Sequence, residues 1–468
     1  MTEDRRRSLP RIDTLLEHSR VMEWIERWGR APVREALRGS LAAARDTVVH
    51  EGAVPAESSM LEYARRRLEA EDLPSLRPVL NGTGVVLHTN FGRAPLAASA
   101  LDAVHQVSSG YSNLEYDLEA GRRGSRYDHC VQLITALTGA EDALVVNNNA
   151  AAVALTINEL SLGREVIVSR GELVEIGGSF RIPDIVARAG ATLREVGTTN
   201  RTRLTDYLQA MGHETGLVLR VHPSNYRVEG FVAEVELHEL AGAARTAQVP
   251  LVHDLGSGLL MPEWLPGFPD EPGPRASLDA GVDLVTWSAD KLFGGPQAGI
   301  LAGTTSAIGR MRQNPLLRAF RVGKMTLAAL EATLRLYRDP VLARDSVPVL
   351  GMLLESPESV KRRARVALES VADGEKEGGG SARIEVAPLR SLVGGGSFPG
   401  HELESWGLVV SGLDPDEVEA GCRANCPPLI GRVEAGKFAV DIRTLAAGLE
   451  SLAAGILSRV ILSLDGRE

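Results

Sequence analysis

The sequence predicts an α/β protein in three parts, with a largely parallel sheet in the central part. The chain has 468 residues, which is more than one ordinary domain requires. Between residues 79 and 337, short β-type runs alternate with helical stretches, as in a βα repeat. Residues 1–75 show only helical periodicity, and strands and helices mix again over residues 340–468. We therefore expect a helical N-terminal domain, a central α/β domain and a small α+β C-terminal domain within these limits.

The composition is ordinary for a globular protein, with 44% hydrophobic and 24% charged residues. The net charge of −10 argues against a generic nucleic-acid-binding surface, although a local cluster of cations could still hold a polyanion. Three cysteines are too few for a disulfide framework, which favours a cytoplasmic protein. No further Cys or His pair accompanies Cys422 and Cys426, so we expect no metal site. No run of about 18 uncharged apolar residues occurs, so we expect no membrane partner.

The N-terminal segment is predicted to be helical from its apolar spacing, as in Val21, Trp24, Ile25 and Trp28. Apart from histidines, every basic residue before residue 78 is an arginine, and acidic residues balance them. Arginine favours planar partners such as phosphates, but solvated helix faces explain the same charges equally well. A linker over residues 72–78 ends this part.

The segment after the linker carries two close glycines, Gly82 and Gly84, before a polar stretch. They suggest a dinucleotide-binding loop, but the third glycine of that fingerprint is absent. A loop that presents Asn90 and Arg93 to a site explains the segment equally well.

The central domain is predicted from a series of strands and helices. The expected strands span residues 143–146, 165–168, 192–196, 216–221, 250–254 and 283–286. A helix is expected over residues 237–248, and a strong helix over residues 327–337 closes the domain. In parallel sheets of this kind, ligands bind at the carboxyl ends of the strands.

The C-terminal domain is predicted to begin with a helix over residues 357–372, capped by Ser356. A flexible turn is expected over residues 374–381. The expected strands span residues 383–386, 408–410 and 438–442, and the expected helices span residues 414–424 and 444–458.

Three polar groups follow strands of the central domain in chain order. Asn148 and Asn149 stand between a strand and an alanine-rich helix, where helix-start N–H groups are available to a phosphate. Asp254 ends a later strand and could keep a pyridine nitrogen protonated. Lys291 follows another strand, where its amine could form a Schiff base with an aldehyde and later carry a proton. Pyridoxal phosphate requires all three kinds of group.

Each group also has an ordinary explanation. A strand-end aspartate is more often a helix cap, asparagine-rich turns are common, and a lone lysine in a turn usually lies on the surface. Ser288, three residues before Lys291, is placed for a further phosphate contact. In an α/β context, with about 37 residues between Asp254 and Lys291, the combination predicts a fold-type-I pyridoxal-phosphate enzyme.

Longer motifs extend this prediction. They span residues 81–93, 169–178, 288–299, 316–327 and 393–397. These motifs resemble bacterial selenocysteine synthase, the L-seryl-tRNA(Sec) selenium transferase family. The similarity covers nearly the whole chain, including the helical N-terminal domain, which in this family is understood to hold the tRNA.

The resemblance implies conversion of seryl-tRNA(Sec) to selenocysteinyl-tRNA(Sec), with selenophosphate as donor and a cofactor-bound aminoacrylyl-tRNA as intermediate. Lys291 would bind the cofactor and carry the proton, and Asp290 could help the hydroxyl leave. The family implicates arginines that match Arg93, Arg318 and Arg321 in binding selenophosphate. The spacing of the last two supports this, because residues i and i+3 share one helical face, although a surface salt-bridge face has the same spacing.

Two other functions fit parts of the pattern. A pyridoxal-phosphate lyase or transferase that acts on a free amino acid needs the same cofactor residues but no N-terminal tRNA domain. A non-enzymatic tRNA-binding or scaffold protein has no need of Lys291 and Asp254. Because fold-type-I sites usually lie between two subunits, we expect at least a homodimer, and the resemblance implies that larger closed rings form.

Overall fold

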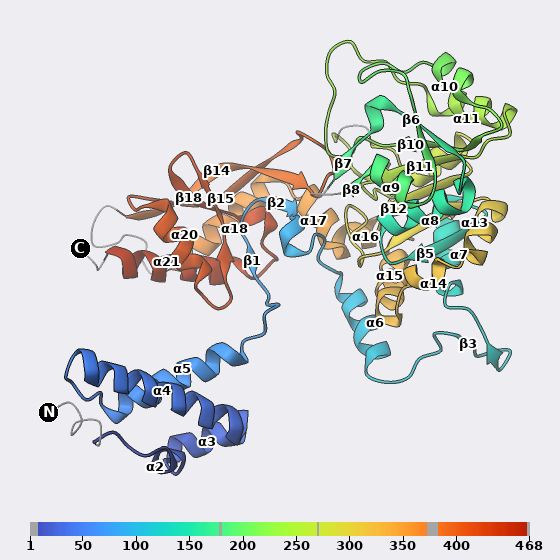
Figure 1. The fold of residues 1–468 in the computed structure, drawn as a ribbon. Helices are drawn as coiled ribbons and strands as arrows, with labels where there is room; N and C mark the ends of the chain where they lie inside the picture. The colour runs from blue at the N-terminus through green and yellow to red at the C-terminus, as the bar shows by residue number, and fades with distance from the viewer. Residues whose placement is uncertain (1–7, 177–179, 269–270, 372–381, 466–468) are drawn as a thin grey trace. The chain divides into compact units, whose positions relative to one another are not determined.

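The computed structural model describes residues 8–176, 180–268, 271–371 and 382–465 (Figure 1). The chain forms two compact units, Met1–Pro78 and Val79–Glu468, which divide at the end of the predicted linker. The turn predicted over residues 374–381 lies outside the described residues. Within the described ranges, no helix is both long and apolar enough to cross a membrane.

The N-terminal unit is a group of helices around one small apolar core. The helices are α2 (Ile12–Leu16), α3 (Ser19–Trp28), α4 (Arg30–His50) and α5 (Glu57–Asp72). Their buried residues include Leu15, Val21, Leu37, Leu61 and Leu68. The buried hydroxyl of Ser40 on α4 donates to the carbonyl of Met60 on α5 at 2.7 Å, which joins the two longest helices.

The larger unit is built on a seven-stranded sheet with the order β5-β13-β12-β11-β10-β6-β9. The strands are β5 (Asp142–Val146), β6 (Glu165–Ser169), β9 (Thr192–Val196), β10 (Thr215–Val221), β11 (Leu251–Gly256), β12 (Leu284–Ser288) and β13 (Gly299–Gly303). All neighbours from β12 to β9 are parallel, whereas β13 is antiparallel to both β12 and β5. The six predicted strands and the largely parallel sheet are confirmed.

Apart from the edge strand β9, both faces of this sheet are buried, which explains why its other strands are nearly continuous apolar runs. Along β5, Ala143 and Val145 enter one core cluster, and Leu144 and Val146 enter the other. The first cluster includes residues of α7 (Asp128–Thr138), α11 (Leu237–Thr246) and α15 (Lys324–Leu336). The second includes residues of α8 (Asn149–Ser161), α9 (Ile182–Arg188) and α13 (Thr305–Gln313).

A five-stranded sheet with the order β17-β18-β15-β14-β2 forms the C-terminal part of the larger unit. The strands are β2 (Val85–Leu87), β14 (Arg383–Gly394), β15 (Glu402–Ser411), β17 (Arg432–Glu434) and β18 (Lys437–Asp441). β2 runs parallel to β14, with Val85 opposite Leu392 and Leu87 opposite Gly394. The segment after the linker therefore joins the C-terminal sheet, although its sequence position places it before the central domain.

Helices α18 (Pro357–Glu369), α20 (Pro415–Arg423) and α21 (Glu450–Asp465) contribute to the core of this sheet. The predicted cap of α18 is confirmed, because Ser356 Oγ accepts from the Ser359 N–H at 3.2 Å. The last helix begins at Glu450 and not at residue 444, because Ile442–Thr444 forms a separate 3-10 turn capped by Asp441.

The helices on both sides of the boundary predicted near residue 340 share one hydrophobic core. Helices α16 (Pro340–Ser346) and α17 (Pro348–Leu354) follow the boundary, and their buried residues belong to the first core cluster of the central sheet. The division of the larger unit into residues 79–337 and 340–468 stays a prediction.

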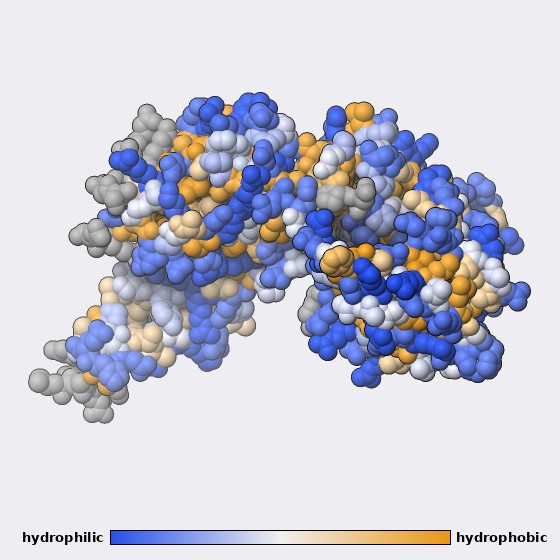
Figure 2. Space-filling view, turned by 90° about the horizontal axis from the view of Figure 1, so that it is seen from above, coloured by the Kyte–Doolittle hydropathy of each residue, from blue (hydrophilic) through white to orange (hydrophobic). Residues whose placement is uncertain are grey.

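The surface is mixed in polarity. Hydrophilic residues predominate in the space-filling view, and apolar residues appear between them (Figure 2). The exposed apolar side chains include Leu76, Tyr111, Leu118 and Phe231. Exposed apolar residues of this kind are common on globular proteins.

Candidate active site

The carboxyl ends of β11 and β12 bring together the groups that the sequence predicts. Asp254 on β11 is 4% exposed. Its Oδ1 accepts hydrogen bonds from Asn149 Nδ2 at 2.8 Å and from Thr286 Oγ1 at 3.1 Å. Burial raises the pKa of Asp254, while these hydrogen bonds and the charge of Lys291 act in the opposite direction. The carboxyl group is thus fixed in place by neighbours on α8 and β12.

Lys291 lies in the turn between β12 and β13 and is 3% exposed. It is therefore buried within the chain and is not the surface lysine that a turn usually carries. The base of the turn is closed by the N–H of Ala289, which donates to the carbonyl of Ala298 at 2.9 Å. Burial lowers the pKa of Lys291, and the positive charge of Arg93 lowers it further, against three nearby carboxyl groups. A lowered pKa increases the fraction of neutral amine, which is the form that attacks a carbonyl.

The start of α8 lies against β13. Asn148 is the N-cap of this helix, and its Oδ1 accepts from the Ala151 N–H at 2.8 Å. A Cβ at Gly299 would overlap the backbone of Asn148, so glycine allows the close approach. The cap uses the Asn148 side chain, and the phosphate contact predicted for Asn148 stays a prediction. Ser288 is buried at the end of β12, and its predicted phosphate contact also stays untested.

Arg93 and Asp290 form an ion pair beside Lys291. Arg93 Nη1 lies 2.6 Å from Asp290 Oδ2, and the N–H of Ala94 donates to the Asp290 carbonyl at 3.3 Å. The Asp290 side chain therefore points to the loop after β2. Arg93 itself has a φ of 64°, an uncommon conformation for a residue with a side chain.

The two other predicted arginines lie elsewhere on the chain. Arg318 is exposed on the short helix α14 (Leu317–Phe320), and Arg321 is the exposed residue that follows it. The prediction that the two share one helical face is wrong, because the helix ends at Phe320 and Arg321 is extended, with φ −70° and ψ 142°. Arg321 forms an antiparallel bridge with Val146, which places it beside the asparagine turn.

Several buried polar atoms near Lys291 have no hydrogen-bond partner within the described residues. They are Asn149 Oδ1, Ser224 Oγ, Ser257 Oγ and Ser397 Oγ. Buried polar atoms without a partner are rare, and a bound ligand or water is one way in which they are satisfied. The buried carboxyl group of Asp254, the start of α8 with the unpartnered Asn149 Oδ1, and the buried amine of Lys291 fit pyridoxal phosphate.

Four residues of this arrangement were not predicted as site residues: Thr286, Ser224, Ser257 and Ser397. Thr286 interrupts the apolar run of β12, and a polar residue inside a buried strand is a signal that could have indicated it. Ser224 lies just after the carboxyl end of β10, and ligands of parallel sheets bind at such strand ends. Ser397 lies in the loop between β14 and β15, within the motif over residues 393–397, but nothing in that motif assigned it to the site of Lys291.

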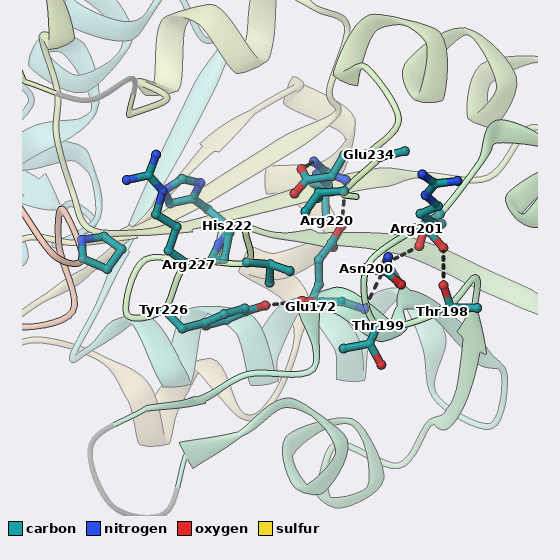
Figure 3. A pocket seen from close by; sticks show the side chains of 18 of the residues that line it. Glu172, Thr198, Thr199, Asn200, Arg201, Arg220, His222, Tyr226, Arg227 and Glu234 are labelled. Carbon is teal, nitrogen blue, oxygen red and sulfur yellow. Dashed lines mark hydrogen bonds and ion pairs between the residues drawn. The ribbon is translucent and has the colours of Figure 1, made fainter. Parts of the chain in front are cut away.

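A pocket of about 480 Å³ opens nearby, beyond the carboxyl ends of β6 and β10 (Figure 3). Its wall is charged: Arg220 lies 2.7 Å from Glu172 and 2.5 Å from Glu234. Burial raises the pKa of Glu172 to about 7, although Arg220 acts in the opposite direction. His222, also in the wall, lies 3.2 Å from Glu271, one of the carboxyl groups that influence Lys291.

Comparison with known proteins finds one family over nearly the whole chain. The family model described as "L-seryl-tRNA selenium transferase" matches residues 79–446, and that described as "Selenocysteine synthase N terminal" matches residues 6–45. The chain is 46% identical over 446 residues to the L-seryl-tRNA(Sec) selenium transferase of Carboxydothermus hydrogenoformans, with 94% of each chain covered. It is 47% identical to that of Geobacter sulfurreducens, with 93% of this chain and 95% of the relative covered.

A solved structure of D-glucosaminate-6-phosphate ammonia-lyase is similar with a TM-score of 0.58 and 19% identity, covering 87% of this chain and 99% of that one. At this identity the likeness concerns the fold alone, and with the strand order it confirms the predicted fold class. The two family models and the full-length relatives establish that the chain belongs to the L-seryl-tRNA selenium transferase family.

Proposed function

We propose that this chain converts L-seryl-tRNA(Sec) to L-selenocysteinyl-tRNA(Sec) with pyridoxal phosphate as cofactor. The observation that carries the proposal is the buried Lys291 beside the hydrogen-bonded pair of Asn149 and Asp254. The relatives that match over nearly their whole length are named for this reaction, and their name is the basis for proposing seryl-tRNA(Sec) as the substrate.

The cofactor residues of the proposal come from three elements of the central sheet. Asp254 would hold the pyridine nitrogen, the first turn of α8 with Asn148 and Asn149 would hold the phosphate together with Ser288, and Lys291 would bind the aldehyde. When bound, pyridoxal phosphate supplies an electron sink that acidifies the Cα–H of the seryl group. Lys291, with its lowered pKa, takes the proton from Cα and later returns it.

The selenium donor of the proposal is selenophosphate. The serine Cβ loses its hydroxyl group and gains selenium, and the phosphorus of the donor gains the oxygen, so the products are the selenol and inorganic phosphate. Arg93 supports this step because its guanidinium stands beside Lys291 and only part of its donor set is used by Asp290. Arg318 and Arg321 would add cations, and their exposure leaves them free to meet an anion.

The helical N-terminal unit would hold the tRNA. The chain would act as a homo-oligomer, which is at least a dimer and could extend to a larger closed ring. The match of residues 6–45 to the N-terminal family model supports the first part. The second part rests on the general observation that fold-type-I sites lie between subunits. Light scattering of the purified protein measures the mass, and a monomer that is fully active would contradict it.

The experiment that tests the function is incubation of the protein with pyridoxal phosphate, seryl-tRNA(Sec) and selenophosphate. The amino acid is then released from the tRNA and identified. We expect selenocysteine with the native protein and unchanged serine with Lys291→Ala. Unchanged serine with the native protein, beside a relative that is active under the same conditions, would contradict the proposal.

A second candidate function, a pyridoxal-phosphate lyase or transferase that acts on a free amino acid, uses the same Lys291 and Asp254. It predicts turnover of free L-serine without tRNA, and the same incubation without tRNA tests it.

A further inference from the structure

A second, smaller pocket of about 210 Å³ lies at the loop between β14 and β15. The lining includes Ser224, Asn225, Gly396, Ser397, Phe398 and His401. Most of these residues belong to the C-terminal sheet and its loop, whereas Ser224 and Asn225 follow β10 of the central sheet. The pocket is therefore formed where the two sheets of the larger unit meet.

This pocket borders Lys291. A Cβ built on Gly396 would lie 4.0 Å from Lys291 Nζ, 3.8 Å from Ser224 Oγ and 3.3 Å from the Asn225 Cβ. Gly396 has a φ of +72°, which glycine adopts without strain. Glycine at this position thus leaves the side of Lys291 that faces the C-terminal sheet open.

The lining of this pocket is neutral. Among the described residues that form it, none is a lysine, arginine, aspartate or glutamate. Arg93, which pairs with Asp290 at 2.6 Å, is not one of the lining residues. A carboxylate placed in the pocket would lose its hydration without gaining a cation from the residues that line it, which is unfavourable.

Two hydroxyl groups in the lining are available as donors. Ser224 is fully buried and Ser397 is 3% exposed, and neither Oγ has a hydrogen-bond partner among the residues that the structure describes. A hydroxyl donor suits a carbonyl oxygen, which needs one or two hydrogen bonds and no counter-ion. An unpartnered buried hydroxyl is itself unfavourable, and a bound carbonyl removes that penalty.

We infer that this pocket binds the ester carbonyl of an aminoacyl ester and excludes a free α-carboxylate. Ser224 and Ser397 are the positioning residues, since their hydroxyl groups donate to that carbonyl while the α-amine is near Lys291. The inference rests on the proposed function, and it adds the part of the site that distinguishes tRNA-bound serine from free serine.

The test uses the full-length protein loaded with pyridoxal phosphate. L-serine methyl ester, L-serinamide and L-serine are titrated at pH 8. The readout is the change in the visible absorbance of the bound cofactor, with each concentration expressed as unprotonated amine. We expect the ester and the amide to bind at least tenfold more tightly than L-serine, and equal affinities would overturn the inference.

Single variants connect this preference to the hydroxyl groups. Ser224→Ala and Ser397→Ala should each weaken binding of the ester about three- to tenfold, the loss of one hydrogen bond, and so reduce the advantage of the ester over L-serine. Ser161→Ala is the matched control, because Ser161 is also fully buried with an unpartnered hydroxyl but packs against Gly216 at the amino end of β10. Melting temperature and cofactor absorbance verify that each variant is folded, and folded serine variants with native ester affinity would overturn the inference.

The outcomes separate this inference from the proposed function. Conversion of seryl-tRNA(Sec) by a protein that binds L-serine as tightly as the ester overturns the pocket and keeps the function. A clear preference for the ester without conversion of seryl-tRNA(Sec) overturns the function and keeps the pocket.

Discussion

The ion pairs on α5 and the ion pair beside Lys291 both join an arginine to a carboxylate, but the first are exposed to solvent and the second is largely buried. On α5, Arg65 lies 2.7 Å from Glu62 and 2.6 Å from Glu69, and both partners are well exposed. Around Lys291, the Arg93–Asp290 pair is as short, but the aspartate side chain is only 10% exposed. Water screens the first set, whereas the second set acts on a buried amine, so similar distances lead to different consequences.

The largest expected effect follows from removing the buried amine. Lys291→Ala should abolish both the visible absorbance of the lysine-bound cofactor and the formation of selenocysteine, because no other amine of the described site can replace it. Absorbance spectra and the tRNA assay measure this. Lys324→Ala is a matched control on an exposed lysine that donates to the Gly110 carbonyl at 2.6 Å, and it should keep the cofactor absorbance.

The next effect concerns the buried carboxyl group. Asp254→Asn keeps the shape but removes the charge that a pyridine nitrogen requires, so we expect activity to fall on the order of 10²-fold or more. Thr286→Val removes only the 3.1 Å hydrogen bond to Asp254 and should have a much smaller effect. Rates with seryl-tRNA(Sec) measure both variants, and equal losses would show that the hydrogen bonds and not the charge are required.

A third prediction concerns pH. Arg93 lowers the pKa of Lys291, so Arg93→Ala should raise that pKa, and a higher pH is then needed to reach the same fraction of neutral amine. The rate at which cofactor-free protein binds pyridoxal phosphate increases with pH, and the midpoint of this increase should lie at a higher pH in the variant than in the native protein. Arg310→Ala, which removes an exposed arginine 3.3 Å from Glu159, should leave the profile in place. A profile that stays in place in Arg93→Ala would show that this charge does not act on Lys291.

The smallest effect is expected on α5. Arg67→Ala removes an exposed ion pair of 2.8 Å with Glu71, and the change in melting temperature should be close to the error of the measurement. The same comparison in high salt should reduce any difference further, because salt screens exposed charges. A large loss of stability would mean that the exposed pairs of α5 do more than surface pairs usually do.

The parts of the site that could be predicted are those with local signals. The strands that carry Asp254 and Ser288 are apolar runs, and a polar residue at the end of such a run in a parallel sheet must lie at one edge. Asn149 lies beside Asp254 for the same reason, since it begins the helix after β5. Strand direction and chain order were sufficient for these residues.

The remaining parts depend on contacts between distant segments. Arg93 meets Asp290 across 197 positions of sequence, and no periodicity encodes that distance. Arg321 has helical spacing from Arg318, but pairing with Val146 holds it in an extended conformation, so the tertiary contact overrides the local pattern. Ser397 reaches the site only because the loop between β14 and β15 returns to the central sheet.

The pairing of β2 with β14 limits how the chain can be divided. A fragment that begins at residue 340 would leave the edge of β14 without its partner, and an unpaired edge strand invites aggregation. A cut at Pro78 separates no paired strands among the described residues and coincides with the boundary between the two compact units. We expect truncation at Pro78 to yield two fragments that each fold. A circular permutation or domain exchange near residue 340 must instead keep residues 85–87 together with the C-terminal sheet.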